Sequence, residues 1–234
     1  MELSSYKNIT QENIKFNEAK EYHVKDSNLS YKRIPIVIKY GGKKKGPLVV
    51  ETPFLFSFGV SKNLDKKNGK LTGYSIPICL WSKDNSPKSS EKEFFNIINL
   101  LVDLSNQHLE GVFGGEFPAL NSPLYYKQIE YTDKKGKKKT KVDDLSAPIL
   151  YPKLIYSDKS KKILSLFNGK KGSVDPYKYI DYNCRVKLAL IFEGLFMSDT
   201  TTSLQIKVHE CYIRELEPRK SLMTINEESD EDDE

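Results

Sequence analysis

The chain has 234 residues, of which 38% are hydrophobic and 29% charged, and its formal net charge is +5. This size and composition fit one folded domain and exclude a fully disordered chain. The three cysteines, Cys79, Cys184 and Cys211, are odd in number and far apart, so we expect no disulfide framework and a reducing, intracellular compartment. No run of eighteen apolar residues and no apolar N-terminal segment occurs, so we expect neither a membrane span nor secretion.

Alternating apolar and polar residues mark the first expected strands. Residues 1–29 are polar and weakly patterned, so we expect an N-terminal extension there. The alternation over 30–40 predicts a strand, and an apolar, β-branched and aromatic run predicts another over 48–58. Because Asn68-Gly69 tolerates the positive φ of a tight turn, it predicts a hairpin whose second strand covers 71–81.

The segment from residue 91 to about residue 109 is predicted to form a helix. Its apolar residues recur at helical spacing, and we expect Phe94, Phe95 and Ile98 to face the core. Ser90 and Glu93 have the spacing of a capping box, and Gly111 follows near the expected end.

After the helix the β pattern resumes. Strands are predicted over 124–132, 148–157, 161–168, 182–197 and 203–216. The basic run 134–139 lies between two of them as a hairpin loop. Many short strands, glycine-bearing turns and one helix favour a mainly β fold. We expect a closed or partly closed antiparallel β-barrel with one amphipathic helix, spanning residues 30–217.

The C-terminus is strongly acidic. Residues 226–234 hold seven carboxylates and no basic or apolar side chain: Glu227, Glu228, Asp230, Glu231, Asp232, Asp233 and Glu234. With these seven negative charges set aside from the total of +5, the other residues carry +12. Like charges repel one another and bury nothing, so residues 218–234 are expected to form a linker and a disordered acidic tail. Tail and body should attract each other.

The sequence contains no recognisable catalytic motif. The three histidines lie in unrelated contexts, and no Gly-x-Ser-x-Gly, P-loop or Gly-x-Gly-x-x-Gly pattern occurs. His209 and Cys211 share one strand face, but no second pair completes a four-ligand metal site. We therefore expect a protein that is not an enzyme and holds no metal or cofactor.

Basic clusters in predicted turns are interleaved with aromatic residues, a pattern that favours nucleic-acid binding. Cations track phosphates, and flat rings stack on unpaired bases at about 1–3 kcal/mol each. A duplex hides its base faces, so the rings favour a single strand. The expected contact residues are Lys43, Lys44, Lys45, Lys62, Lys70, Tyr74, Trp81, Lys134, Lys135, Lys137, Lys138, Lys139, Tyr151, Lys153 and Tyr156.

Some of these features have a second interpretation. The alternating rings of Phe54, Phe56 and Phe58 fit either a core face or a base-stacking face. Trp81 fits a core position or a stacking platform, and the basic run 134–141 fits a solvated loop or a phosphate-contacting arm.

The order of several segments resembles a known family. These segments are ETPFLFSFGVSK at 51–62, the Asn-Gly hairpin, GYS at 73–75, the capped helix, APILYPKLIY at 147–156 and SLQIKVHE at 203–210. Together with the tail they resemble the acidic-tailed single-stranded DNA-binding proteins of short-tailed bacteriophages and nucleo-cytoplasmic large DNA viruses, in particular the giant-virus branch. The resemblance covers residues 30–216 and the tail.

The resemblance implies an OB-fold protein that coats exposed strands in DNA replication, recombination and repair, in the host cytoplasm or nucleus. It also implies a tail that recruits DNA polymerase and other replication proteins, and a homodimer in which the tail occupies the partner's groove. Phage members end in an aromatic residue, whereas this chain ends in Glu234, so charge is the expected mode of action of the tail.

Two classes of function follow from these observations. The first is a sequence-independent single-stranded DNA-binding protein whose tail competes for the DNA groove. The alternative is a basic virion or scaffold protein that packages duplex DNA, or a protein that binds RNA.

Overall fold

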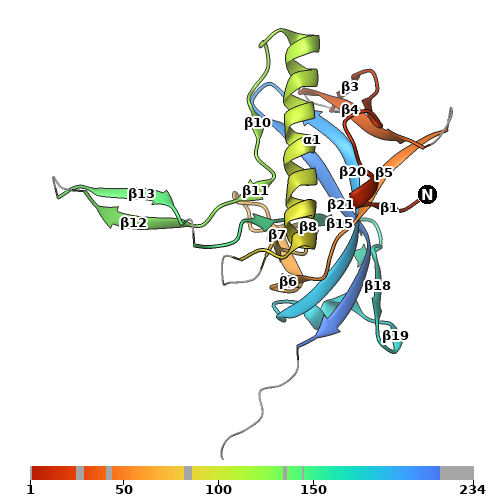
Figure 1. The fold of residues 1–234 in the computed structure, drawn as a ribbon, viewed down its shortest axis with the longest axis vertical. Coiled ribbons are helices and arrows are strands. Elements are labelled where there is room, and N and C mark those ends of the chain that lie inside the picture. The colour runs from red at the N-terminus through yellow and green to blue at the C-terminus, as the bar shows by residue number, and fades with distance from the viewer. Residues whose placement is uncertain are drawn as a thin grey trace, which may run out of the picture.

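The structure is a computed structural model that describes residues 2–24, 29–40, 44–81, 86–133, 136–143 and 145–216 (Figure 1). Lys43, Lys134, Lys135 and the expected linker and acidic tail over 218–234 lie outside the described residues. Within the described ranges the protein is mainly β with one long helix, as expected.

The described strands are β1 (Ser4–Ser5), β2 (Ile14–Phe16), β3 (Lys20–His23), β4 (Ser30–Lys39), β5 (Lys45–Glu51), β6 (Leu55–Ser57), β7 (Ser61–Leu64), β8 (Leu71–Ser75), β9 (Ile78–Cys79), β10 (Leu120–Asn121), β11 (Leu124–Tyr125), β12 (Gln128–Thr132), β13 (Lys138–Val142), β14 (Ile149–Leu150), β15 (Lys153–Leu154), β16 (Tyr156–Ser157), β17 (Lys162–Ile163), β18 (Leu166–Gly169), β19 (Gly172–Ser173), β20 (Cys184–Met197) and β21 (Thr202–Glu215). The helix is α1 (Ser89–Phe113), and two short 3-10 turns are η1 (Tyr6–Asn8) and η2 (Pro176–Tyr179). All of the strands except β12, β13, β16 and β17 belong to one sheet.

The hairpin of β20 and β21 is the centre of this sheet. The two strands pair antiparallel along their whole length, and β20 also pairs with β6, β5 and β4 in turn. Alternate residues of both strands are buried, among them Val186, Leu188 and Val208. Because side chains alternate across a strand, the residues between them point to the opposite, outer face of the sheet.

The run expected as one strand over 48–58 is two strands, β5 and β6, separated around Pro53. Thr52 bridges the break: its N–H donates to the Leu188 carbonyl at 2.9 Å, and its hydroxyl accepts the Leu188 N–H at 2.9 Å. A proline has no N–H to donate to a ladder, which explains the break around Pro53.

The expected antiparallel barrel is not found, because the sheets are not closed. The pairing is also mixed: β1 pairs in parallel with β5, and β10, β15 and β18 pair in parallel with β21. Alternation along a strand reports which side faces the core. It reports neither the direction of the neighbouring strand nor whether the sheet closes.

The first residues of the chain belong to the sheet. β1, β2 and β3 pair with β5 or β4, and Ile9 and Ile14 lie in the core. We expected residues 1–29 to be an extension because strands of two to four residues are too short to give a visible alternation.

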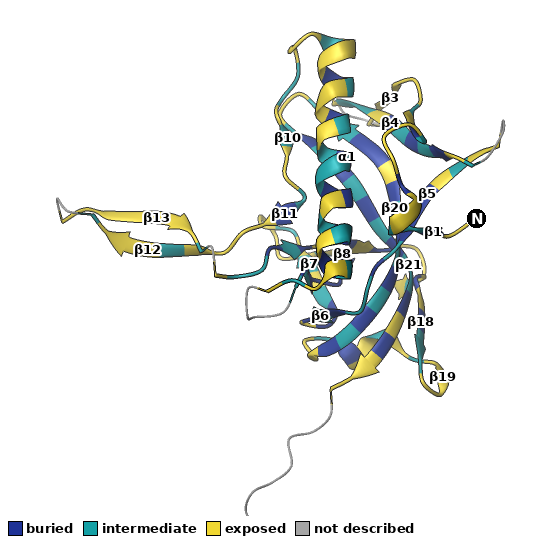
Figure 2. Cartoon of the chain, in the orientation of Figure 1, coloured by how far each residue is buried: buried dark blue, intermediate teal, exposed yellow. Residues whose placement is uncertain are grey.

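Helix α1 covers the inner face of the sheet (Figure 1). Phe94, Ile98 and Leu101 are fully buried in the same core as the inner residues of β20, as expected for the first two. Figure 2 shows this arrangement, with buried residues along α1 and along the strands behind it. Within the described ranges no helix is both long enough and apolar enough to span a membrane.

The ends of α1 differ from the expected ones. The Lys88 N–H donates to Glu91 Oε2 at 2.8 Å, so the cap lies two residues before the Ser90 cap that the sequence suggested. Gly114, with a φ of 58°, ends the helix, and its N–H donates to the Glu110 carbonyl at 2.9 Å. Glycine suits this left-handed position, whereas Gly111 lies inside the helix.

β12 and β13 form a hairpin that projects from the body of the protein, and we call it the arm (Figure 1). Nearly all of its residues are exposed (Figure 2). Lys138 and Lys139, expected in the loop, lie in strand β13.

Candidate nucleic-acid interface

A row of paired residues crosses the outer face of the sheet. Arg185 of β20 pairs with Phe56 of β6, Phe56 with Cys79 of β9, Cys79 with Ile149 of β14, and Ile149 with Tyr125 of β11. Directly paired residues point to the same side of a sheet, so these five side chains are neighbours.

The first part of this row borders a hollow of about 630 Å³, which we call the aromatic hollow. Its lining residues are Phe56, Phe58, Cys79, Trp81, Lys127, Ser146, Ala147, Ile149, Asn183 and Arg185. The rings of Phe56 and Phe58 meet edge to face at 5.2 Å, and 41% of Phe58 is exposed. Of the two interpretations left open for these rings, the core face does not apply to Phe58.

Trp81 is intermediate between a core position and an exposed stacking platform. Its ring is half-buried and meets Phe95 of α1 edge to face at 5.3 Å, while it also lines the aromatic hollow. The helix therefore fixes the orientation of a ring that remains part of the hollow.

A second hollow, of about 600 Å³, lies further along the outer face, and we call it the lysine hollow. Its lining residues are Asn63, Thr72, Gly73, Tyr74, Ser75, Tyr151, Lys153, Leu154, Ile155, Tyr156, Asp158 and Lys207. Four residues expected from the sequence, Tyr74, Tyr151, Lys153 and Tyr156, converge here. Lys153 pairs directly with Lys207 across β15 and β21, which places two cations side by side.

The three tyrosines of the lysine hollow differ in exposure. Tyr74 is only 7% exposed and meets Tyr156 and Tyr177 edge to face at 5.4 and 5.7 Å, so it forms the floor. Its burial raises the pKa of its hydroxyl. Tyr151 is 48% exposed and meets Tyr125 edge to face at 6.2 Å.

The two hollows lie next to each other on the outer face, because Ile149 lines the aromatic hollow and Tyr151 lines the lysine hollow. Residues 148–152 run antiparallel to residues 76–80, because the Leu80 N–H donates to Pro148 O at 3.0 Å and the Ile76 N–H to Pro152 O at 3.1 Å. The side chains of Ile149, Tyr151 and Lys153, two residues apart from one another, therefore all point to the outer face. Tyr151 lies between the two hollows, and we call the combined surface the groove.

Several cations of the groove were not expected from the sequence. Lys127 lies 3.6 Å from Asp143, and the pKa of this carboxyl is lowered mainly by its hydrogen bond from Ser146. Lys207 Nζ forms an ion pair with Glu193 Oε1 at 2.8 Å. Arg185 lies opposite Arg214, whose guanidinium is 4.3 Å from the centre of the Phe54 ring. Burial raises the pKa of Cys79, so its thiol stays neutral near pH 7.

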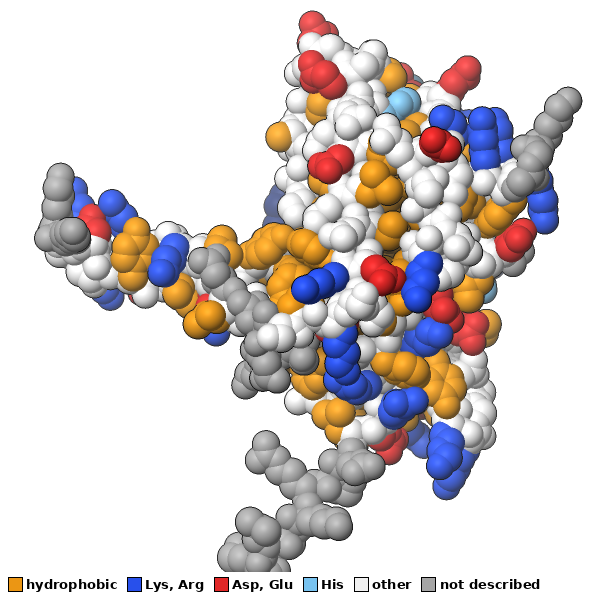
Figure 3. All heavy atoms as spheres, viewed as in Figure 1, with side chains coloured by type: hydrophobic (Ala, Val, Ile, Leu, Met, Phe, Trp, Pro, Cys, Tyr) orange, Lys and Arg blue, Asp and Glu red, His pale blue; other side chains and the backbone are white. Residues whose placement is uncertain are grey.

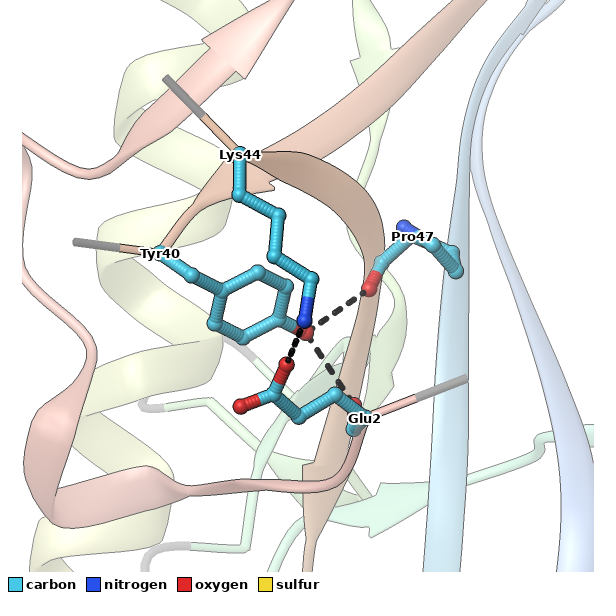
Figure 4. Close-up of polar contacts among 4 residues, drawn as sticks. All are labelled: Glu2, Tyr40, Lys44 and Pro47. Atoms are coloured by element: carbon cyan, nitrogen blue, oxygen red, sulfur yellow. Dashed lines mark hydrogen bonds and ion pairs between the residues drawn. The ribbon is translucent and has the colours of Figure 1, made fainter. Parts of the chain in front are cut away.

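Within the expected cluster at Lys43–Lys45, Lys44 contacts the N-terminal segment. Lys44 Nζ lies 3.1 Å from Glu2 Oε2, and the Tyr40 hydroxyl lies 3.1 Å from Glu2 O and 3.5 Å from Pro47 O (Figure 4). These contacts tie the N-terminal segment to the β4–β5 hairpin. Lys45 is exposed at the start of β5 and lines neither hollow.

The remaining expected lysines lie at the rim or on the arm. Lys62 and Lys70 are exposed around the β7–β8 hairpin. The pKa of Asp158 in the lysine hollow is lowered mainly by its hydrogen bond from Lys161, and the charge of Lys70 adds to this effect. Lys137 and Lys138 are exposed on the arm, and Lys139 pairs with Asp133 at 3.0 Å. Figure 3 shows Lys and Arg side chains next to hydrophobic ones along the arm and below α1.

Within the described ranges, no three His, Cys, Asp or Glu side chains are grouped so that they could hold a metal ion. The fold and the groove thus define a mainly β protein with one helix and with aromatic rings and cations on the outer face of its sheet. The family described as "Protein of unknown function (DUF2738)" matches residues 14–231, and the chain belongs to this family. A comparison with curated proteins finds no match.

Proposed function

We propose that this protein binds single-stranded DNA without sequence preference, through the groove, and coats exposed strands in replication, recombination and repair. The observation that supports this proposal best is the alternation of open rings and cations along the groove. Phe58 and Tyr151 offer exposed ring surface, and Arg185, Lys127 and Lys153 lie next to them.

The chemistry of the groove suits unpaired bases. Each base that stacks on a ring contributes about 1–3 kcal/mol, and every base has a flat face, so the contact tolerates any sequence. The rings of Phe56 and Trp81 are half-buried in the aromatic hollow, where an unpaired base can reach them. The faces of paired bases are covered by their neighbours, so a duplex would contact only the cations.

The acidic tail, in this proposal, competes with DNA for the groove and recruits replication proteins such as DNA polymerase. Strand β21 ends at Glu215, one residue after Arg214. Arg214 lies opposite Arg185, which lines the aromatic hollow. Glu227 follows Leu216 by eleven residues, and a chain of that length spans at most about 36–40 Å. In this proposal the seven carboxylates, on a tether of that length, act as a substitute for phosphates at the groove's cations.

A competition titration tests the proposal. A labelled oligothymidylate is bound to the protein, and unlabelled single-stranded DNA, duplex DNA and RNA of equal length are added separately at two salt concentrations. The proposal predicts that single-stranded DNA competes at least about tenfold better than duplex, with a log–log salt slope of about −0.7 per phosphate contacted. Equal competition by duplex would favour the packaging alternative, and stronger competition by RNA would change the substrate.

A further inference from the structure

A third group of rings lies on the outer face, on the other side of Lys207 from the groove. Tyr22 of β3 pairs directly with Tyr31 of β4, and their rings stack at 5.3 Å with an interplanar angle of 13°. Phe196 of β20 lies 5.3 Å from Tyr31. The Arg33 guanidinium lies 5.8 Å from the ring centre of Tyr22 and 5.5 Å from that of Tyr31. We call these four residues the tyrosine stack.

The tyrosine stack borders a hollow of about 300 Å³, which we call the third hollow. It is lined by Tyr22, Arg33, Glu193, Gln205, Lys207 and the backbone around Gly194. Lys207 also lines the lysine hollow, so the third hollow adjoins the groove.

Gly194 lines the third hollow, at a position that requires glycine. This residue has a φ of 141° at a shift in the pairing of β20 and β21 and pairs with Pro35 of β4. A Cβ there would lie 2.1 Å from Ile34 O, so no side chain can occupy the position without moving the backbone.

We propose that the tyrosine stack and the third hollow form a second stacking subsite for the same single strand, so that the strand continues from the groove across Lys207. This inference rests on the proposed function. A base would cover Tyr22, which is 40% exposed, and Arg33 and Lys207 would contact the phosphates on either side.

A cross-strand pair of aromatic residues also stabilises a sheet, and this accounts for the contact between Tyr22 and Tyr31. Sheet stability does not account for the Arg33 guanidinium over both rings. Nor does it account for the third hollow beside them, which shares Lys207 with the lysine hollow. Glu193 lines the third hollow, and its negative charge would repel a polyanion there. It also forms an ion pair with Lys207 at 2.8 Å. Its removal should therefore strengthen binding.

The distance between the subsites sets the length of DNA that reaches both. From Tyr22 to Lys153 the sheet crosses four pairs of adjacent strands, which at about 4.8 Å each gives about 19 Å across the strands. The pairing registers add an offset of about seven residues along β20, about 23 Å at about 3.3 Å each, so the two residues are about 30 Å apart along the sheet. A short oligonucleotide fills the groove alone, whereas a longer one also covers Tyr22.

The test is a series of oligothymidylates of about 4 to about 16 nucleotides, the range of site sizes of single-strand-binding sheets. Tyr22→Leu should weaken the binding of the longest oligonucleotides at least about fivefold and leave the shortest unchanged. Tyr22→Phe, the matched control, keeps the ring and should bind all lengths like the wild type. Glu193→Gln should strengthen the binding of long oligonucleotides.

A loss that is equal at all lengths, or no loss at the longest, would overturn the second subsite while leaving the proposed function in place. A failure of the wild-type protein to bind any oligonucleotide would overturn both. Thermal melting of each variant separates a loss of binding from a loss of folding.

Discussion

Replacing Phe58 with Leu is the sharpest test of base stacking in the aromatic hollow. Phe58 follows β6, is 41% exposed and meets the ring of Phe56 edge to face at 5.2 Å. Because so much of the side chain is exposed, the change should lower the free energy of unfolding by less than about 1 kcal/mol. An effect of Phe58→Leu on DNA binding can therefore be distinguished from an effect on the stability of the fold.

The expected loss of binding follows from the energy of a stacked base. At about 1–3 kcal/mol per base, Phe58→Leu should raise the Kd for single-stranded DNA about 5- to 140-fold. The log–log salt slope should stay unchanged, because no charge is removed. Phe58→Tyr keeps a ring and should bind like the wild type.

Fluorescence anisotropy with a labelled oligothymidylate measures both quantities, and a denaturant titration measures the free energy of unfolding. A Kd within twofold of the wild type for Phe58→Leu would refute base stacking at this ring. A changed salt slope would show that the substitution has disturbed the cations as well.

Four further predictions concern charge, the tail, pH and the backbone. Arg185→Gln should reduce the magnitude of the log–log salt slope by about 0.7, measured by titrations at several salt concentrations; an unchanged slope would remove Arg185 from the interface. Deleting residues 226–234 should tighten DNA binding, most at low salt, and an equal affinity at low salt would exclude competition by the tail. Burial lowers the pKa of His108 below its ordinary value of 6.5, so the unfolded chain takes up this proton more readily and stability should fall as the pH drops through 6.5. His108→Phe should flatten that pH dependence in denaturant titrations at pH 7.5 and 5.5, and an equal slope in both proteins would contradict it. Gly59→Ala should cost about 2 kcal/mol or more in thermal melts, because φ is +87° and a Cβ would lie 2.4 Å from Tyr179 O; a wild-type melting temperature would contradict the strain.

The long amphipathic elements could be predicted from the sequence. β4, β20, β21 and α1 each extend over enough residues to display their period, and their buried positions follow from it. The shorter strands of the N-terminal segment show no period, so their place in the sheet depends on partners far away in the sequence. The same holds for the parallel pairing with β21.

The candidate site could be predicted only in part. Tyr151, Lys153 and Tyr156 alternate on one short segment, and the structure brings them together in the lysine hollow. Lys44 lies in a basic cluster, which predicts a contact with DNA, and the structure adds an ion-pair partner, Glu2, 42 residues away. No local pattern contains that information.

Arg185 is a cation of the groove that the sequence did not single out. The alternation of β20 places it on the outer face, yet the sequence does not show that Phe56 and Cys79 lie beside it. A lone arginine on a strand is ordinary, and it becomes a candidate contact only when long-range pairing surrounds it with rings.

The most direct test of the central claim is a map of the lysines that single-stranded DNA protects from acetylation, measured by mass spectrometry. If single-stranded DNA lies in the groove, Lys127, Lys153 and Lys207 should be strongly protected. Lys7, which is exposed next to Tyr6 on the segment that packs against α1, should be little protected. Stronger protection of Lys7 than of the three groove lysines, or equal labelling of all four with and without DNA, would contradict it.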